Sequence, residues 1–503
     1  MPRRAQPTKR PNVTLDPGLP TPLVKQLYDR LRDEILSGQL PPGTRLPSTR
    51  TLASELGVSR GTTVLAYEQL ELEGYLVSHV GQGTAVSHQL PITPDPEAPE
   101  DGNVPVAGNV TAPMPRLAAH IHSLRTVPDL QTDDETVQTA FHSGAPALDQ
   151  FPYAIWARLV ARHARRSLPD LAYYQPPAGY LPLREAIAVR IGISRGVRCT
   201  PDQIILTSGA QGALDFAART LLNPGDEAWI ENPGYFGAQG ALIAAGAKLV
   251  PVPVDDQGLD VVAGARLAPH ARLVFTSPSH QFPTGVTMSL SRRLALLNWA
   301  RRAAAWIVED DYDSEFRFSG RPLESLQGLQ SDGPVLYVGT FSKVLFPSLR
   351  VGYLVAPTEL VDSLLLTRRF SDIHIPLLEQ LALTDFIQEG HYDRHIRRMR
   401  KLYRHRRDLL HAGLRRHLGN LLDVQLPDTG MTMVAWLPPN TDDRHVASLA
   451  TAAGISARPI SRYSLEPLPR GGLLLGYAGI DDIGIRDGVR RLATALGDLA
   501  ERE

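Results

Sequence analysis

Six short apolar segments alternate with helical segments across the middle of the chain, and this alternation constrains the fold more than any other feature. The apolar segments are residues 203–209, 227–232, 248–254, 271–277, 305–311 and 335–340. Each has the length of a strand, and helical patterns separate most of them. This rhythm predicts a mostly parallel, doubly wound α/β sheet with helices on its faces. Sheets of this kind bind ligands at the carboxyl ends of their strands.

The composition is that of a globular protein with a large core. The chain has 503 residues, of which 43% are hydrophobic and 21% charged, and this length predicts about three ordinary domains, or one large and one small domain. The net charge of −1 means that affinity for DNA would have to come from a local patch. Cys199 is the one cysteine, which excludes a disulfide within the chain and fits a reducing cytoplasm. No apolar run reaches the roughly 18 residues of a membrane span, so no membrane partner is expected.

The N-terminal part of the chain predicts a basic arm and then a three-helix unit with a hairpin. Residues 1–20 are basic and rich in proline, without the apolar core of a signal peptide, and are expected to form a disordered arm. Residues 21–88 contain one helical pattern, a second that Ser48 would cap and a third that Ser59 would cap. The short turn between the last two helices is the layout of a helix-turn-helix, and the hairpin after it would be a wing.

Residues 46–86 read LPSTRTLASELGVSRGTTVLAYEQLELEGYLVSHVGQGTAV, which resembles the winged helix-turn-helix of the GntR transcription regulators almost from end to end. The resemblance implies contact with double-stranded DNA through the start of the third helix and through the wing. The residues that it places at DNA are Ser48, Arg50, Ser59, Arg60, Thr62, Gly81, Gly83 and Thr84. Hydroxyls and helix N-terminal amides hold phosphates, and arginine can bind guanine with two hydrogen bonds. The alternative is a unit that serves only for packing.

Charge alone would not hold one copy of this unit on DNA. Residues 1–87 carry ten Lys and Arg side chains against eight Asp and Glu side chains, so the unit is only weakly basic. Two copies on repeated half-sites would supply the missing affinity. Residues 89–136 are rich in proline, acidic and small side chains, which predicts a flexible tether with at most a short helix near residues 119–127.

Lys343 lies in a polar loop directly after the last apolar segment. Residues 337–353 read YVGTFSKVLFPSLRVGY, which resembles the cofactor-lysine loop of the fold-type I aminotransferases, enzymes that bind pyridoxal 5′-phosphate (PLP). The resemblance implies that Lys343 forms a Schiff base with PLP and that Arg350 binds its phosphate. Thr340 and Ser342 would add cofactor contacts from the same loop. The alternative for a single lysine is a solvated surface position.

Other parts of the sheet match further cofactor contacts of the same family, in the same order along the chain. Tyr235 would stack on the pyridine ring, Asp310 would keep the ring nitrogen protonated, and Tyr312 would donate to the phenolate oxygen. A turn after the first apolar segment would hold the phosphate with its backbone amides. The residues of this turn are Ser208, Gly209, Ala210 and Gln211. The alternatives are a turn that only closes a βα unit and a tyrosine in a surface loop.

The sequence departs from the family at one cofactor contact. Many aminotransferases have Asn-Pro-Thr-Gly where this chain has SHQFPTG at residues 279–285, so the asparagine that contacts the phenolate oxygen is missing. His280 or Gln281 would stand in for it. Tyr174 matches a tyrosine that reaches the neighbouring subunit's cofactor phosphate, which implies a homodimer. No metal site is expected.

Residues 137–503 are expected to form the aminotransferase-like unit, with a large subdomain at 175–390 and a small subdomain at 391–503. A basic helix after Gly390 opens the small subdomain, and its charges would form a solvated face or, alternatively, a DNA-facing patch. Family members hold a substrate carboxylate with an arginine in this part of the chain. The arginines here are Arg458, Arg462 and Arg470, and none falls on the expected position.

A winged helix joined by a tether to an aminotransferase-like unit resembles the MocR subfamily of GntR regulators over nearly the whole chain. The resemblance implies a cytoplasmic transcription regulator in which PLP controls operator binding. Phe236 and Gly237 occupy the place of an arginine found in members that respond to γ-aminobutyrate. This favours PLP itself as the signal, as in the PdxR type that controls vitamin B6 synthesis. The alternatives are a sensor of a PLP-bound amine, an aminotransferase with full or half turnover, and a DNA-binding protein with an inactive cofactor fold.

Overall fold

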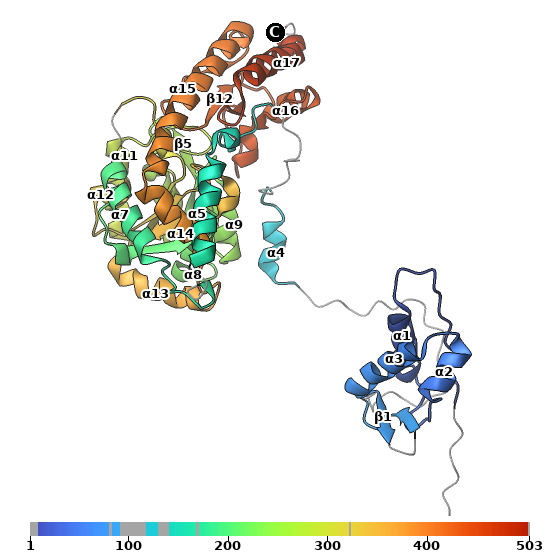
Figure 1. Cartoon of the computed structure of the whole chain (residues 1–503). Coiled ribbons are helices and arrows are strands. Elements are labelled where there is room, and N and C mark those ends of the chain that lie inside the picture. The colour runs from blue at the N-terminus through green and yellow to red at the C-terminus, as the bar shows by residue number, and fades with distance from the viewer. Residues whose placement is uncertain are drawn as a thin grey trace, which may run out of the picture. The chain divides into compact units, whose positions relative to one another are not determined.

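The computed structural model describes residues 9–79, 83–90, 117–128, 140–166, 171–320 and 323–500. The chain divides into two compact units, Met1–Met114 and Pro115–Glu503. Each unit is described by itself, and Figure 1 labels many of its elements. Within these described ranges, no helix is both long and apolar enough to cross a membrane.

The N-terminal unit has the three helices and the hairpin that the sequence predicts. Its helices are α1 (Leu23–Leu36), α2 (Thr49–Leu56) and α3 (Arg60–Leu72), and its strands are β1 (Leu76–His79) and β2 (Gly83–Val86). The strands pair antiparallel, with Leu76 opposite Val86. One core joins the helices to the hairpin. Among its buried side chains are Leu27, Leu31, Ile35, Leu52, Ala66, Leu70, Leu76 and Val86.

Two hydroxyl caps fix where the second and third helices begin. The Ser48 hydroxyl accepts a hydrogen bond from the Thr51 amide, and the Ser59 hydroxyl accepts one from the Thr62 amide, both at 3.1 Å. Between the helices Gly57 has φ +66°, a left-handed conformation that glycine adopts without a steric penalty. The caps and the glycine together define the turn of the helix-turn-helix.

Residues 9–20 differ from the predicted disordered arm. The Lys9 amide donates to the Arg45 carbonyl at 3.0 Å, the Asn12 amide donates to the Glu34 carboxylate at 2.8 Å, and Val13 is buried in the core of the unit. A prediction from composition misses this attachment because a single valine and a few backbone bonds anchor an otherwise polar segment. Residues 1–8 lie outside the described residues. The same holds for residues 80–82 of the wing, which include Gly81.

An eight-stranded sheet forms the centre of the C-terminal unit. Its strands are β3 (Ile204–Thr207), β4 (Glu227–Asn232), β5 (Lys248–Asp255), β6 (Gly258–Leu259), β7 (Leu273–Thr276), β8 (Trp306–Asp311), β9 (Val335–Thr340) and β10 (Gly352–Val355). In space the order is β3-β10-β9-β8-β7-β4-β5-β6. The strands from β5 to β9 in this order are parallel, whereas β10 is antiparallel to both of its neighbours and β6 is antiparallel to β5. The mostly parallel sheet predicted from the six apolar segments is confirmed.

Helices cover both faces of this sheet. They are α5 (Tyr153–Arg166), α7 (Leu181–Arg195), α8 (Gly209–Leu221), α9 (Phe236–Ala244), α10 (Val261–Leu267), α11 (Leu290–Ala303), α12 (Leu326–Leu329), α13 (Thr358–Arg369) and α14 (Leu377–Gln388). Along β9, Leu336 and Val338 join the cluster that contains α8, α9 and α13. Val335 joins the cluster of α10, α11 and α12, and Tyr337 joins the cluster of α7 and α14. This alternation follows from the two-residue period of a strand.

A smaller antiparallel sheet and three helices complete the unit. The strands are β11 (Asp423–Val424), β12 (Thr432–Trp436), β13 (Arg458–Pro459) and β14 (Gly472–Gly476), in the order β11-β12-β14-β13. The helices are α15 (His391–Leu418), α16 (Asp443–Ala452) and α17 (Asp482–Ala500).

The basic helix α15 is neither a plain solvated face nor a free cationic patch. Arg406 and Arg407 are buried and donate to the carbonyls of Ala478 and Pro427. Arg397 and Lys401, by contrast, are exposed. Part of the charge run therefore ties the helix to neighbouring segments, and a solvated face describes only its outer side. A count of charges cannot separate these two uses of arginine.

A short helix of the predicted tether belongs to the C-terminal unit. It is α4 (Ala119–Leu124), which packs against α9. Three residues further on, Val127 packs against a buried cluster, called here the aromatic cluster. The buried members of the aromatic cluster are Phe236, Val434, Ile460, Tyr463 and Leu474. Residues 91–116 and 129–136 of the tether lie outside the described residues.

Candidate functional site

Loops at the carboxyl ends of five strands, β3, β4, β7, β8 and β9, carry the predicted cofactor residues. Lys343 follows β9 by three residues, and its Nζ donates to the Gly144 carbonyl at 3.0 Å. Gly144 has φ +88°, and a Cβ at this position would lie 2.9 Å from the lysine Nζ. A glycine therefore leaves room for the lysine head. Gly144 was not predicted because it lies about 200 positions earlier in the chain, and nothing in its local sequence points to the lysine.

Arg350 meets the start of α8. Its Nη2 donates to the Ser208 carbonyl at 2.8 Å, and a Cβ at Gly209 would lie 3.1 Å from its Nη1. Gly209 has φ +76°, so glycine is needed here both for the backbone conformation and for the close approach of the guanidinium. A guanidinium beside the N-terminus of a helix is a suitable place for a phosphate, because both present N–H donors and positive charge. Ala210 and Gln211 continue the same first turn.

The loop from β9 to Lys343 contains a buried hydroxyl that lacks a partner. The Thr340 Oγ1 accepts a hydrogen bond from the Ser342 amide at 3.1 Å. The Ser342 hydroxyl is buried, and no hydrogen-bond partner for it occurs among the described residues. A buried polar atom of this kind is costly unless a ligand satisfies it.

Asp310 is a buried carboxylate at the end of β8. Its Oδ1 also has no hydrogen-bond partner in the described part of the chain. Burial above all, together with the charges of Asp311, Glu231 and Asp313, raises the pKa of Asp310 to about 8, although the charge of Lys343 opposes this shift. A cationic N–H donor placed at Oδ1 would restore the ionised form.

Tyr235 is the N-cap residue of α9. It interacts electrostatically with Asp310, predicted for the ring nitrogen of the cofactor, and with Arg350, predicted for its phosphate. Its hydroxyl donates to the Gln211 Oε1 at 3.4 Å. Burial raises the pKa of Tyr235, the charge of Asp310 raises it further, and the charge of Arg350 lowers it. The Phe282 ring meets the tyrosine ring edge-on at 6.0 Å. The structure therefore brings Tyr235 within electrostatic range of both Asp310 and Arg350.

The two predicted substitutes for the missing asparagine have different surroundings. Gln281 is used by the fold, because its Nε2 donates to the Glu231 carboxylate at 3.1 Å and to the Pro233 carbonyl at 2.8 Å. His280 lies beside Tyr312, with its Nδ1 3.0 Å from the tyrosine hydroxyl. Of the two, His280 has the position from which a side chain can act on the phenolate end of a cofactor.

The arrangement fits PLP. The cofactor offers a cationic ring nitrogen, an anionic phosphate and an aldehyde, and the site offers an unpartnered carboxylate oxygen, an arginine at a helix N-terminus and a lysine. The buried Oδ1 of Asp310 and the buried hydroxyl of Ser342 test this fit, because neither has a partner among the described residues and such a ligand would provide one. The residues that would hold PLP are Ser208, Gly209, Ala210, Gln211, Tyr235, His280, Asp310, Tyr312, Thr340, Ser342, Lys343 and Arg350.

Tyr174 lies on the surface rather than among these residues. Its side chain is 82% exposed, and its ring meets His374 edge-on at 6.1 Å. Tyr173, the preceding residue, and Phe370, which lies close to His374 in the chain, are also largely exposed. Exposed aromatic side chains of this kind are typical of an interaction surface.

The three small-subdomain arginines are placed differently. Arg470 donates to the Leu437 carbonyl and pairs with Asp423 at 3.1 Å, so it is held on the small sheet. Arg458 acts electrostatically on Tyr463, whose pKa burial raises and this arginine lowers. Arg462 also acts on Tyr463, but more weakly. The Tyr463 ring meets Phe282 edge-on at 5.0 Å, so Arg458 has the strongest link to the site.

The residues predicted to contact DNA lie on the helix-turn-helix and the wing. Arg50, Ser59 and Arg60 are exposed at the starts of α2 and α3. Ser48 and Thr62 take part in the helix caps. Gly83, which is exposed, and Thr84 begin the second strand of the hairpin.

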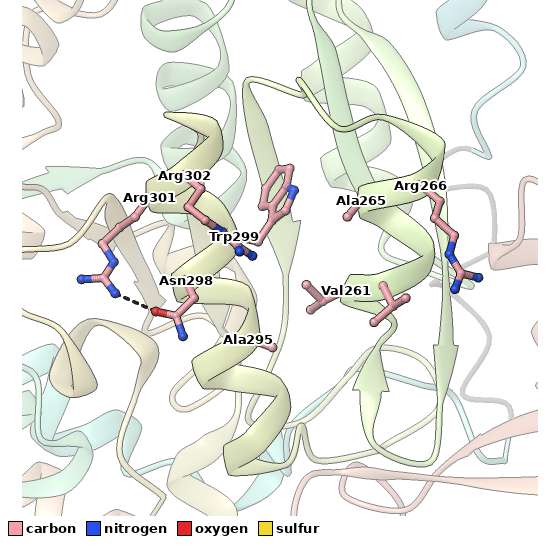
Figure 2. Close-up of a pocket in the computed structure, with 9 residues that line it drawn as sticks. Val261, Ala265, Arg266, Ala295, Asn298, Trp299, Arg301 and Arg302 are labelled. Carbon is pink, nitrogen blue, oxygen red and sulfur yellow. Dashed lines mark hydrogen bonds between the residues drawn. The ribbon is translucent and has the colours of Figure 1, made fainter.

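A second hollow lies between α10 and α11 (Figure 2). Its lining includes Val261, Ala265, Arg266, Asn298 and Arg302. The Trp299 ring stacks on Trp229 at 3.7 Å beneath it. None of the predicted cofactor residues lines this hollow, so the site at the strand ends is a separate place.

Two family models match the chain. The model "Bacterial regulatory proteins, gntR family" matches residues 23–86, and the model "Aminotransferase class I and II" matches residues 137–492. Together they cover both units and leave most of the predicted tether between them.

Curated relatives are similar to this chain over nearly their whole length. A probable rhizopine catabolism regulatory protein, MocR, of Rhizobium meliloti is 44% identical over 96% of both chains. The transcriptional regulator TauR of Rhodobacter capsulatus is 35% identical over 96% of this chain and 98% of its own. The pyridoxine biosynthesis regulator PdxR of Corynebacterium glutamicum is 32% identical over 94% of this chain and 96% of its own.

Solved structures resemble the C-terminal part of the chain. The α-aminoadipate aminotransferase LysN of Thermus thermophilus, complexed with N-(5′-phosphopyridoxyl)-L-leucine, has a TM-score of 0.67 and 30% identity over 77% of this chain and 96% of its own. A kynurenine aminotransferase of Pyrococcus horikoshii has a TM-score of 0.67 and 27% identity over 76% of this chain and 95% of its own.

Proposed function

The chain belongs to the MocR type of GntR-family transcription regulators, which join a helix-turn-helix domain to an aminotransferase class I and II domain. We propose that its second unit binds PLP through Lys343 and that this binding controls how its first unit binds an operator. The protein is thus a regulator, and its aminotransferase fold serves to sense. The coupling between the two units need be only about 1–3 kcal/mol, or about 5- to 150-fold in DNA affinity.

The observation that carries this proposal is the buried, unpartnered Oδ1 of Asp310 within electrostatic range of Lys343. When bound, PLP supplies an electrophilic aldehyde and a cationic ring nitrogen. Lys343 would hold the cofactor through its amine, Asp310 would accept from the ring nitrogen, and Arg350 with the first turn of α8 would bind the phosphate. Tyr235 would cover the ring and exclude water from it.

The test of cofactor attachment compares two lysines. We expect borohydride reduction of the protein with PLP, followed by peptide mass analysis, to mark Lys343. Lys343→Ala should abolish the mark, and Lys248→Ala should leave it unchanged, because Lys248 is an exposed residue of β5. Equal labelling of wild type and Lys343→Ala would contradict the proposal.

We propose PLP itself as the signal, as in the regulation of pyridoxine synthesis named for the PdxR relative. Phe236 and Gly237, which replace an arginine at the start of α9, support this choice. Phe236 is buried and stacks on Tyr463 at 5.5 Å, so no charged side chain stands at this position to bind an effector. Deletion of the chain should then change transcription of pyridoxine-synthesis genes, and unchanged transcripts would contradict this assignment.

Arg458 favours a second candidate, a regulator that senses an amine bound to PLP. Its link to Tyr463 at the edge of the site would suit an effector with an acidic group. The relative that is 44% identical is a probable regulator of rhizopine catabolism, whereas the PdxR relative is 32% identical. If this candidate holds, an amine should change DNA binding only when PLP is present, and Arg458→Met should remove that change.

An aminotransferase with an appended DNA-binding unit is the enzyme alternative, favoured by the likeness to aminotransferase structures. Steady turnover of an amino donor with a keto acid would establish it. We expect at most a half-transamination, without steady turnover. A homodimer is part of the proposal, because the exposed Tyr174 would complete the site of a neighbouring subunit.

A further inference from the structure

Two buried side chains, His280 and Asp313, meet the partly buried Tyr312 at one end of the site. The Nδ1 of His280 is 2.8 Å and 3.0 Å from the two carboxylate oxygens of Asp313, and 3.0 Å from the Tyr312 hydroxyl. His280 and Asp313 are each only 3% exposed. Asp313 is not among the residues predicted for the site, so its contact with His280 is a feature that the sequence did not predict.

The imidazole of His280 is held in place from two sides. Its ring lies nearly parallel to the Tyr312 ring at 5.7 Å. On another side is Gly430, which has φ +92° and where a Cβ would lie 2.1 Å from the His280 Cε1. No larger side chain fits at residue 430, and the imidazole cannot turn away from Asp313 without losing both contacts.

The Asp313 carboxylate determines the tautomer of His280. An ionised carboxylate only accepts hydrogen bonds, and a buried one is costly without a donor. The Nδ1 of His280 is the side-chain donor that both oxygens of Asp313 share, so we assign the Nδ1 hydrogen to this bond. A nitrogen that carries a hydrogen cannot accept one from the Tyr312 hydroxyl.

We propose that Asp313 acts through His280 to keep the Tyr312 hydroxyl hydrogen free for donation to the phenolate oxygen of PLP. Asp313 and His280 are then positioning residues. Together they support the hydrogen bond to the phenolate oxygen, to which the family's missing asparagine would otherwise contribute. This inference rests on the proposed binding of PLP through Lys343. It predicts that removal of Asp313 has the same effect as removal of the tyrosine hydroxyl, even though Asp313 does not touch the cofactor.

A purely electrostatic role of Asp313 predicts the opposite sign. The PLP–lysine linkage is cationic in its protonated form, so loss of a nearby negative charge would lower the pH at which the linkage loses its proton. Loss of a hydrogen bond to the phenolate oxygen would raise that pH, because a phenolate without a donor keeps more of its negative charge and holds the neighbouring linkage proton more tightly. The Asp310, Asp311 and Glu231 charges also act on Tyr312.

The test is a pH titration of the visible absorption of PLP-loaded wild type, Asp313→Leu, Asp313→Asn, Tyr312→Phe and the double variant Tyr312→Phe/Asp313→Leu. Leucine offers no acceptor, whereas asparagine keeps an amide oxygen that can still accept from the His280 Nδ1 and removes only the charge. We expect Tyr312→Phe and Asp313→Leu each to raise the midpoint by about one pH unit, the tenfold change that loss of one hydrogen bond to a charged oxygen produces. Asp313→Asn should not raise it. The double variant should match Tyr312→Phe alone. A midpoint that is lowered or unchanged in folded Asp313→Leu, or effects that simply add, would overturn the proposal.

A second measurement separates this proposal from the binding of PLP. In PLP-free protein labelled with ¹⁵N-histidine, the His280 signal, identified by its loss in His280→Gln, should show a protonated Nδ1 in wild type and not in Asp313→Leu. An unprotonated Nδ1 in wild type would overturn the positioning role even if PLP binds. Failure of wild type to bind PLP, with Nδ1 protonated, would instead overturn the proposed function and leave the His280–Asp313 pair established as a feature of the fold.

Discussion

At the scale of single residues, Asp310 has the clearest cost and the clearest use. Its raised pKa, about 8, means that the PLP-free fold favours the protonated carboxyl. The unfolded chain holds Asp310 at an ordinary acidic pKa, so the folded state binds more protons between these two values. Stability of the PLP-free protein should therefore fall as pH rises from about 4 to about 8, by up to about 1.4 kcal/mol per pH unit.

Because the ionised Asp310 destabilises the PLP-free fold, Asp310→Asn should have opposite effects on stability and on PLP binding. Asp310→Asn should raise the melting temperature of PLP-free protein at pH 8 and leave it nearly unchanged at pH 4, because asparagine cannot ionise. The same substitution should weaken PLP binding, since it removes the negative charge that keeps the proton on the ring nitrogen. Thermal melts with and without PLP check both effects. A variant that is destabilised at pH 8 without PLP would contradict the role given to burial.

Single residues also show how far the sequence can be interpreted. Lys343, Asp310 and Arg350 were predicted because the segments around them resemble the cofactor-binding segments of the fold-type I aminotransferases. Gly144 and Asp313 were not, because their contacts depend on how distant loops meet, and no local pattern records that. Gln281 illustrates the same limit, since its amide is taken up by the Glu231 carboxylate.

At the scale of elements, the cap of α3 joins stability to DNA recognition. The Ser59 hydroxyl accepts from the Thr62 amide, and α3 begins at the next residue. Ser59→Ala should cost about 1 kcal/mol of the N-terminal unit's stability and should also weaken DNA binding. Ser54→Ala, an exposed position inside α2, is the matched control. Denaturant unfolding of the two variants checks the difference, and equal stabilities would count against the cap.

The helix α4 is the element through which the site can act on the tether. Val127 packs on the aromatic cluster, and within that cluster Phe236 stacks on Tyr463, which in turn meets Phe282 beside Tyr235. A change at the cofactor ring therefore has a path of packed side chains to the segment that leads to the DNA-binding unit.

This path gives a prediction for Val127. Val127→Asp should place a charge against the aromatic cluster, release α4 and reduce the PLP-dependent change in DNA affinity, while PLP binding is kept. Thr126→Asp puts the same charge on the neighbouring exposed side chain and should leave the response intact. Fluorescence anisotropy with labelled operator DNA, with and without PLP, measures the response. An unchanged response in Val127→Asp would exclude this path.

Elements were the most predictable level of the structure. The three helices of the first unit and six of the eight strands of the large sheet follow from apolar periods and from caps such as Ser48, whereas β6 and β10 were not predicted. The attachment of residues 9–20 and the buried arginines of α15 did not follow, because composition and charge counts average over the few contacts that decide them. Both cases concern polar segments held by backbone hydrogen bonds.

At the scale of the whole molecule, weak modules must act in pairs. The N-terminal unit has only two more basic than acidic side chains over residues 1–87, so the isolated unit should bind operator DNA far more weakly than the full chain. The full chain should sediment as a dimer and protect two half-sites. Sedimentation and footprinting of the full chain and of residues 1–90 check this. Equal affinity of the two would contradict the need for a second copy.

The central claim is that a cofactor bound through Lys343 changes the affinity of the protein for DNA. The most direct measurement is the affinity of purified wild type and Lys343→Ala for the upstream region of their own operon, each titrated with PLP. The account predicts that PLP changes the affinity of wild type by about 5-fold or more and does not change that of Lys343→Ala. Identical affinities of wild type with and without PLP, or an equal change in both proteins, would contradict it.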